Sequence, residues 1–388
     1  MTEMVFGTVA DSPSDPIFPR WWRSVDRVSM AAVLGLFLIG MLLGLAASPP
    51  LAERNGLDTF HYVIRQAVFG TMALGVMVFL SMQTPSNIRR LAVLGFIGAF
   101  VAIALLPFLG TDYGKGAVRW YSLGFISLQP SEFLKPTFVI FSAWLMSASA
   151  DLDGPPGKMM SFVVAVVLTL LLALQPDFGQ AVLILASWGL MYFIAGAPML
   201  LLIALAACVV GAGVFAYSNS EHFASRIDGF LSPDLDPTTQ LGFATNAIQE
   251  GGIFGVGVGQ GSVKWSLPDA HTDFIIAVAA EEYGLVLVVT IILLFMTITI
   301  RSLMRLVRER DPFVRLAGVG LATLLGMQAL INLGVAVRLL PAKGMTLPFV
   351  SYGGSSLLAA GITLGMLLAL TCRRPQHEMG DILAGGQQ

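Results

Sequence analysis

The chain has 388 residues, of which 56% are hydrophobic and only 12% are charged, and its formal net charge is −2. Soluble proteins carry about 25% charged residues, so this composition indicates an integral membrane protein and excludes an ordinary soluble domain. The slight negative charge argues against nucleic acid as a partner. Two cysteines in apolar runs and four scattered histidines fit neither a disulfide framework nor a set of metal ligands.

Residues 1–28 are polar and rich in proline, and they end in PRWWRSVDRV. Their acids and prolines do not fit a cleavable signal peptide. We expect a cytoplasmic tail followed by an interfacial segment, because Trp21 and Trp22 suit the headgroup level and the neighbouring arginines favour the cytoplasmic side.

Ten apolar runs follow, and a membrane-spanning helix needs about 20 such residues. The uncharged stretch 178–220 is too long for one helix, so we divide it at Gly196-Ala197-Pro198. We predict an all-α polytopic fold with one membrane domain over residues 29–372, followed by a cytoplasmic tail at 373–388. The predicted spans are 29–48, 62–82, 91–109, 133–150, 159–175, 178–195, 198–218, 273–300, 314–337 and 349–372.

The distribution of Lys and Arg predicts the orientation. With the N-terminus inside, most basic residues fall in the inner segments, above all in RSLMRLVRER at 301–310. An even number of spans then places both termini in the cytoplasm. The polar segment 219–271 becomes a large outer loop, and the half-apolar stretch 110–130 becomes a re-entrant or interfacial segment.

Four basic residues of the outer segments are candidates for binding a phosphate or pyrophosphate, a role that paired Arg and Lys side chains suit. They are Lys115, Arg119, Arg338 and Lys343. The alternative is that each is a solvated loop charge without a ligand, and the residues alone leave both open.

Three other charged residues lie at membrane depth, where a charge costs about 2.5–3.5 kcal/mol on insertion scales. Glu132 and Lys135 are three residues apart, so they share a helix face and can pair. Asp177 lies in the tight turn LQPDFGQ. We predict one ion network that is partly structural and partly the wall of a polar cavity.

The stretch 263–284, VKWSLPDAHTDFIIAVAAEEYG, is the strongest candidate for the chemistry. It carries Asp273, Glu281 and Glu282 at or beyond the start of an apolar run, where carboxylates are expected to face protein or a wet cavity. Spacing alone favours a simple helix-cap role for Asp273. The glycine-rich run 252–264 is not a nucleotide loop, because it follows no strand and lacks the Gly-Lys-Ser/Thr ending.

Four motifs together favour a role for Asp273 beyond capping a helix. They are GAVRW…LQPSEFLKP at 116–136, QPDFGQ at 175–180, AHTDF…AEEYG at 270–284 and LLPAKGMTLPFVSYGGSS at 339–356. In this order they resemble the SEDS family of peptidoglycan polymerases, the FtsW/RodA group, over roughly residues 25–372. PAKGMTLPF and WWRSVDR resemble its cell-division branch more than its elongation branch. The family pattern GVNxGLLP reads GVAVRLLP here, with Ala336 and Arg338.

The resemblance implies a ten-span glycosyltransferase of the bacterial inner membrane. Such an enzyme joins lipid II, a disaccharide-pentapeptide on undecaprenyl pyrophosphate, into glycan strands at the outer face during cell division. The matching motifs imply Asp273 as the essential acid, with Glu132, Lys135 and Asp177 as further site residues. We add Glu281 to the substrate-binding candidates. The implied partners are a class B penicillin-binding protein, which is a transpeptidase, other division proteins and membrane lipids.

The chemistry then has an expected form. The donor sugar is α-linked and the polymer is β-linked, so the anomeric centre inverts, and inversion in one step needs a base on the acceptor hydroxyl. We expect Asp273 to accept the proton of the acceptor's 4-hydroxyl. The four basic candidates would meet the charge of the leaving pyrophosphate, with a divalent cation, Mg²⁺ or Mn²⁺, as a candidate cofactor.

Two other classes of function remain as alternatives. A lipid II flippase would line its pathway with the charges at membrane depth, and it would also need polar groups in the inner half of the bundle. A non-catalytic scaffold of the division machinery would not need Asp273 or Arg119 at all.

Overall fold

The computed structural model describes residues 17–112, 118–122, 124, 127–150, 153–219, 224, 227–229, 239–267, 270–340 and 344–372. Two predicted site residues, Lys115 and Lys343, lie outside these ranges, as does the tail 373–388.

The predicted membrane spans are confirmed as helices, each of 17 to 32 residues. Six of them are long and apolar enough to cross a membrane by length and composition, and α7, α8 and α13 contain shorter apolar stretches. The predicted division of 178–220 is also confirmed, because α7 ends at Ile194 and α8 begins at Met199. The helices are α2 (Arg27–Arg54), α3 (His61–Ser81), α4 (Pro85–Leu109), α5 (Pro130–Ala148), α6 (Gly157–Leu174), α7 (Phe178–Ile194), α8 (Met199–Asn219), α11 (Ile275–Leu306), α12 (Pro312–Ala336) and α13 (Gly354–Leu370).

The starts of two spans show why the helices begin where they do. Thr84 and Asp311 cap α4 and α12 by accepting hydrogen bonds from backbone N–H groups of the first turn. In both helices the next residue is proline, whose fixed φ suits the first helical position and whose missing N–H is not needed there.

The segments between the spans hold more structure than the sequence predicted. The described part of the long segment between α8 and α11 contains the helix α10 (Gln240–Gly251) and the 3-10 turn η1 (Val263–Trp265). In the described part of 110–130, β1 (Tyr121–Ser122) pairs with β2 (Ser127–Leu128) in an antiparallel hairpin. The described part of this segment therefore contains a β-hairpin.

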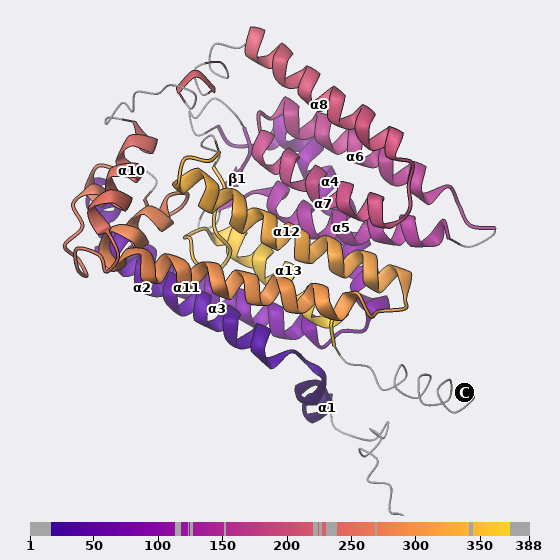
Figure 1. The fold of residues 1–388 in the computed structure, drawn as a ribbon, viewed down its shortest axis with the longest axis horizontal. Coiled ribbons are helices and arrows are strands. Elements are labelled where there is room, and N and C mark those ends of the chain that lie inside the picture. The colour runs from indigo at the N-terminus through magenta and orange to yellow at the C-terminus, as the bar shows by residue number, and fades with distance from the viewer. Residues whose placement is uncertain are drawn as a thin grey trace, which may run out of the picture.

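The helices form one bundle around α12, which packs against α5, α7, α11 and α13 (Figure 1). The short amphipathic helix α1 (Ile17–Ser24) lies at one end of the bundle, and α10 and the hairpin lie at the other. We call these the α1 end and the α10 end. The helices around α12 bury most of it, and its less buried residues, including Thr323, Gly326, Leu330 and Leu333, recur every three or four positions along one narrow face.

An ion cluster joins three elements at the α1 end. Asp26, the N-cap of α2, accepts hydrogen bonds from Arg301 of α11 at 3.0 and 3.1 Å and pairs with Arg305 at 3.2 Å. Arg305 also donates to the backbone oxygen of Thr371, which follows α13. Burial opposes the charged form of Asp26, but the hydrogen bonds from Arg301 and Ser29 and the charges of the two arginines outweigh it, so the pKa of Asp26 is lowered.

The Asp26→Asn variant should therefore unfold more easily at neutral pH, by about 1–3 kcal/mol, because it leaves two arginines without their carboxylate. A carboxyl with a lowered pKa stabilises the folded state above its ordinary pKa of 3.8 and loses this contribution as the pH falls through the folded-state value. Thermal unfolding in detergent at pH 7 and pH 3 measures this. The difference between wild type and variant should shrink at pH 3, and a constant difference would contradict the ion pairs.

Candidate active site

The α10 end gathers most of the predicted site residues whose positions are described. Glu132 and Lys135 lie in the first two turns of α5, Asp177 precedes α7, Asp273 precedes α11 and Arg338 follows α12. The chain runs up and down the bundle, so these alternate helix ends meet on one side (Figure 1).

The predicted pairing of Glu132 with Lys135 is confirmed. Lys135 Nζ lies 2.9 Å from Glu132 Oε2, and the two residues are only 2% and 4% exposed. Two glutamines complete the cluster: Gln180 of α7 donates to Glu132 Oε1 at 2.6 Å, and Lys135 donates to Gln328 Oε1 of α12 at 3.4 Å. A buried ion pair needs such extra hydrogen bonds, because burial removes both charges from water.

Beside this pair lies a small cavity of about 10 Å³, enough for about one water molecule. It is bounded by Glu132, Lys135 and Gln328 on one side and by Ser356 and Thr363 of α13 on the other. Leu325, Pro348, Ala359 and Ala360 complete its lining, so the pair borders an internal space with both polar and apolar walls.

Asp177 belongs to a neighbouring cluster. Its Oδ2 accepts hydrogen bonds from Ser131 Oγ at 3.2 Å and Gln129 Nε2 at 3.4 Å, both at the start of α5. The charges of Glu132, Lys135 and Arg119 act on it, but no direct bond from Asp177 to Glu132 or Lys135 occurs among the described residues. The predicted single network thus consists of two adjacent clusters that share the start of α5.

Arg119 holds the turn on which Asp177 lies. Its Nε and one terminal nitrogen donate to the backbone oxygens of Gln175 and Pro176, at 2.9 and 2.7 Å. A guanidinium carries five N–H donors, so these two bonds leave donors with which a phosphate could bond.

Asp273 occupies a partly exposed position in the turn before α11. The N-cap position of α11 is Phe274, so Asp273 lies one residue before the cap position that spacing favoured for it. Asn332 of α12 donates to the backbone oxygen of Asp273 at 3.1 Å. The Asp273 carboxylate lies against Gly344, where an added Cβ would be 3.2 Å from Oδ2.

Glu281 and Glu282 have a different position. Glu281 is fully buried and accepts a hydrogen bond from the backbone N–H of Ser262 at 2.5 Å. Glu282 pairs with Lys264 at 2.5 Å and accepts from Gly259 N. Both carboxylates hold the glycine-rich run onto α11, so the position of Glu281 gives no support to its prediction as a substrate-binding residue.

The glycine-rich run fits against a kink in α11. Gly284 has φ +74°, and an added Cβ there would meet the backbone oxygen of Ile253. The N–H groups of Leu285 and Val286 donate to the oxygens of Gly252 and Ile253. Close approach of two backbones, together with positive φ, explains the glycines better than contact with a substrate.

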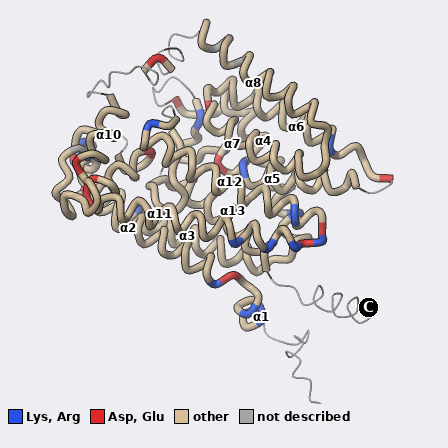
Figure 2. Tube along the Cα trace, in the orientation of Figure 1, with Lys and Arg blue, Asp and Glu red and all other residues tan. Residues whose placement is uncertain are grey.

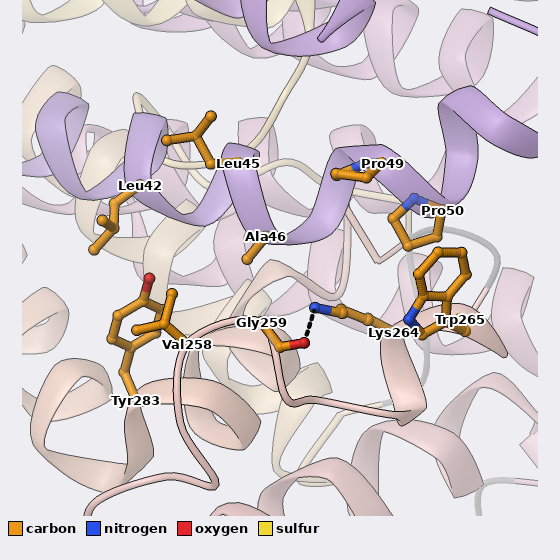
Figure 3. Close-up of a pocket in the computed structure, with 10 residues that line it drawn as sticks. All are labelled: Leu42, Leu45, Ala46, Pro49, Pro50, Val258, Gly259, Lys264, Trp265 and Tyr283. Atoms are coloured by element: carbon orange, nitrogen blue, oxygen red, sulfur yellow. Dashed lines mark hydrogen bonds between the residues drawn. The ribbon is translucent and has the colours of Figure 1, made fainter. Parts of the chain in front are cut away.

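An apolar groove of about 260 Å³ separates this run from the last turns of α2 (Figure 3). Leu42, Leu45 and Pro49 line one wall, and Val258 and Tyr283 line the other. Lys264 points across its floor to the oxygen of Gly259, 3.3 Å away. The charge of Lys264 is paired within the protein, with Glu282.

Arg338 occupies a position that normally favours glycine. It has φ +59° and directly follows the C-cap of α12. The N–H groups of Arg338 and Leu339 donate to the oxygens of Val335 and Gly334, which is the pattern of a Schellman motif with its left-handed residue at Arg338. The glycine of the family pattern GVNxGLLP falls at this position, so the departure noted in the sequence costs backbone strain.

The Arg338→Gly variant should therefore be more stable than wild type, by about 1 kcal/mol, because glycine adopts positive φ without a steric cost. Thermal unfolding measures this, with Arg338→Ala as the control that removes the side chain but keeps the strain. If Arg338 also binds pyrophosphate, both variants lose activity while only the glycine variant gains stability. A glycine variant less stable than the alanine variant would contradict the assignment of strain.

The sequence did not allow several residues beside Asp273 to be predicted as part of the site. Tyr62, His271 and Tyr352 form a cluster of rings with centroids 5.4 to 5.7 Å apart, and Tyr352 N donates to the oxygen of His271. Gln328 and Asn332 were missed as well, because isolated amides in an apolar helix give no periodic signal. They lie four residues apart, which places them on one face of α12.

The described residues contain no group of three or more His, Cys, Asp or Glu side chains that could hold a metal ion. Because Mg²⁺ is usually held by one or two carboxylates together with substrate phosphates, a divalent cation stays a prediction.

Comparison with known proteins agrees with this geometry. The model of a family described as cell cycle proteins, which covers FtsW, RodA and SpoVE, matches residues 27–375. The chain belongs to this family. The probable peptidoglycan glycosyltransferase FtsW of Caulobacter vibrioides is 42% identical over 356 residues, covering 92% of this chain and 91% of the relative. The protein of the same description from Halorhodospira halophila is 37% identical, covering 95% and 94%.

Two solved structures share the fold of this member of the FtsW, RodA and SpoVE family. One, described as structural coordination of polymerization and crosslinking by a peptidoglycan synthase complex, has a TM-score of 0.72 at 28% identity, covering 90% of this chain and 98% of that one. The rod shape determining protein RodA of Thermus thermophilus has a TM-score of 0.66 at 26% identity, covering 90% and 97%. The protein is thus a multi-pass bacterial membrane protein of all-α fold.

Proposed function

We propose that this protein is a peptidoglycan glycosyltransferase of cell division that polymerises lipid II. Its relatives are described as probable peptidoglycan glycosyltransferases FtsW, and the sequence covers nearly their whole length. The observation that carries the proposal is the position of Asp273, a partly exposed carboxylate at the end of the bundle that also holds the buried Glu132–Lys135 pair. Asn332 and Gln328, one turn apart on α12, contact Asp273 and Lys135 respectively.

The proposed reaction is a one-step inverting transfer. Asp273 takes the proton of the acceptor's 4-hydroxyl as its oxygen attacks the anomeric carbon of the donor, and the bond from that carbon to pyrophosphate breaks. The leaving pyrophosphate keeps its electron pair and needs positive charge rather than a proton. Arg119 and Arg338 supply part of that charge, and Lys115 and Lys343 are the further candidates from the sequence.

The proposed orientation places the α10 end and the site in the periplasm, with both termini in the cytoplasm. Figure 2 shows that basic residues gather at the α1 end, where the described ones include Arg89, Arg90, Arg301, Arg305, Arg308, Arg310 and Arg315. Excess Lys and Arg mark the cytoplasmic side of inner-membrane proteins. The substrate would then be met outside the cell membrane, where the polymer is needed.

The proposed partner is a class B penicillin-binding protein, a transpeptidase that cross-links the new strand. Support comes from the fold shared with a chain of a complex that polymerises and crosslinks peptidoglycan. Other division proteins and the surrounding lipids complete the expected set of partners.

The test is synthesis of glycan strands from purified lipid II by the purified protein in complex with its transpeptidase. Strands of many disaccharides are expected. Movement of lipid II across liposomes without strand formation would overturn the proposal in favour of a flippase. Absence of both activities would favour a scaffold.

A further inference from the structure

Asn332 joins two loops that are far apart in the sequence. It lies near the end of α12 and is 2% exposed. Its single amide nitrogen donates to the oxygen of Asp273 at 3.1 Å and to the oxygen of Met345 at 2.6 Å. One side chain on a helix thus fixes the turn before α11 against the loop before α13.

Gln328, one turn earlier on the same face, extends this clamp. Its Nε2 donates to the oxygen of Thr346 at 2.9 Å, and its Oε1 accepts from Lys135. The two amides therefore hold consecutive carbonyls, at Met345 and Thr346, along the side of α12. The loop is tied through Lys135 to the buried pair on α5.

The clamp acts on the part of Asp273 that sets the direction of its carboxylate. The bonded oxygen belongs to Asp273 itself, and the carboxylate lies against Gly344, the neighbour of the other bonded residue. Asp273 itself lies in a turn rather than in a regular helix or strand. A misplacement of about 1 Å at a reacting group can cost about 100-fold in rate.

The amide oxygen of Asn332 is buried and has no hydrogen-bond partner among the residues that the structure describes. The same holds for the amide oxygen of Gln66 in α3, so the two side chains resemble each other in this respect. A leucine at position 332 would remove the unpaired acceptor but would leave the carbonyl oxygens of Asp273 and Met345 without the amide donor, so it should lower stability. The two donated bonds are what distinguish asparagine from leucine at this position.

We propose that Asn332 is a positioning residue of the transfer reaction: by holding the carbonyls of Asp273 and Met345 together, it aims the Asp273 carboxylate at the acceptor hydroxyl. This inference rests on the proposed function, in which Asp273 is the base. Asn332 acts through Asp273 and touches no reacting atom.

The chain offers a matched control in Gln66 of α3. Gln66 is 1% exposed, and its Nε2 also donates to two backbone carbonyls, those of Gly40 at 3.1 Å and Val350 at 3.2 Å. The variants Asn332→Leu and Gln66→Met each replace an amide with an apolar side chain of similar shape. Each therefore removes the same number and type of bonds, but only the first releases Asp273.

The experiment measures initial rates of strand formation over a series of lipid II concentrations, in the complex with the transpeptidase. Asn332→Leu should lower the maximal rate about 100-fold and change the half-saturating concentration less than about threefold. Gln66→Met should keep both values within about threefold of wild type. Both variants should melt at a lower temperature than wild type.

Three outcomes would overturn the inference: a maximal rate of Asn332→Leu within threefold of wild type, an equal loss in Gln66→Met, or a loss confined to the half-saturating concentration. A second variant, Asn332→Ser, covers the case in which Asn332→Leu does not fold. Asn332→Ser keeps one donor, so it should fold and show a maximal rate between those of wild type and an inactive variant. A wild-type maximal rate in Asn332→Ser would overturn the inference. Wild type and Asp273→Ala are assayed for strand formation in parallel, as controls for the proposed function. An active Asp273→Ala variant, or an inactive wild type, would instead overturn the proposed function on which the inference rests.

Discussion

Replacement of Asp273 by alanine is expected to abolish strand formation, with a loss of at least about 10³-fold in rate, because the reaction then lacks its general base. The variant should fold normally. Asn332 binds the backbone oxygen of Asp273, which alanine retains, and the lost side chain is partly exposed. Asp273→Asn should be nearly as inactive, since an amide cannot accept the proton.

The control is Asp58→Ala, which removes an exposed carboxylate between α2 and α3 at the same end of the bundle. Its activity should stay within about twofold of wild type. Retained strand formation by Asp273→Ala would move the base elsewhere. Asp177 would then be the next carboxylate to replace, because it lies beside the same polar clusters.

The second large effect is expected for the buried pair of Glu132 and Lys135. Replacing Lys135 with methionine leaves the Glu132 carboxylate buried with Gln180 as its one hydrogen-bond donor among the described side chains. The variant should lower the free energy of unfolding by about 3–5 kcal/mol. Glu132→Gln should be similarly harmful because it leaves the ammonium group without its charge partner. The double variant, which buries no charge, should recover at least about 2 kcal/mol of either loss.

Thermal unfolding of the four proteins forms a double-mutant cycle for stability, and strand formation by the same samples separates structure from chemistry. A pair that is only structural would regain activity together with stability in the double variant. We expect stability to return and activity to stay low, because the pair borders an internal cavity and connects through Gln328 to the loop beside Asp273. A Lys135→Met variant as stable as wild type would contradict the buried ion pair.

The sequence by itself determined the number, the approximate ends and the class of the helices. Lipid requires long apolar segments, and Thr84-Pro85, Asp311-Pro312 and the break at Gly196 to Pro198 mark where such segments start or stop. The Glu132–Lys135 pair was also predictable, because residues three apart on a helix are neighbours. The motifs around Asp273 and Asp177 indicated the family from residue types and order alone.

Only the tertiary structure decided what these residues contact. Asn332 reaches a carbonyl 59 positions away, and no local pattern marks such a bond because its partner is backbone rather than side chain. The burial of Glu281 against the glycine-rich run depends on the kink at Gly284, and the strain at Arg338 depends on how α12 ends. Periodicity reports which face of an element is apolar, whereas helix packing decides which polar groups meet within it.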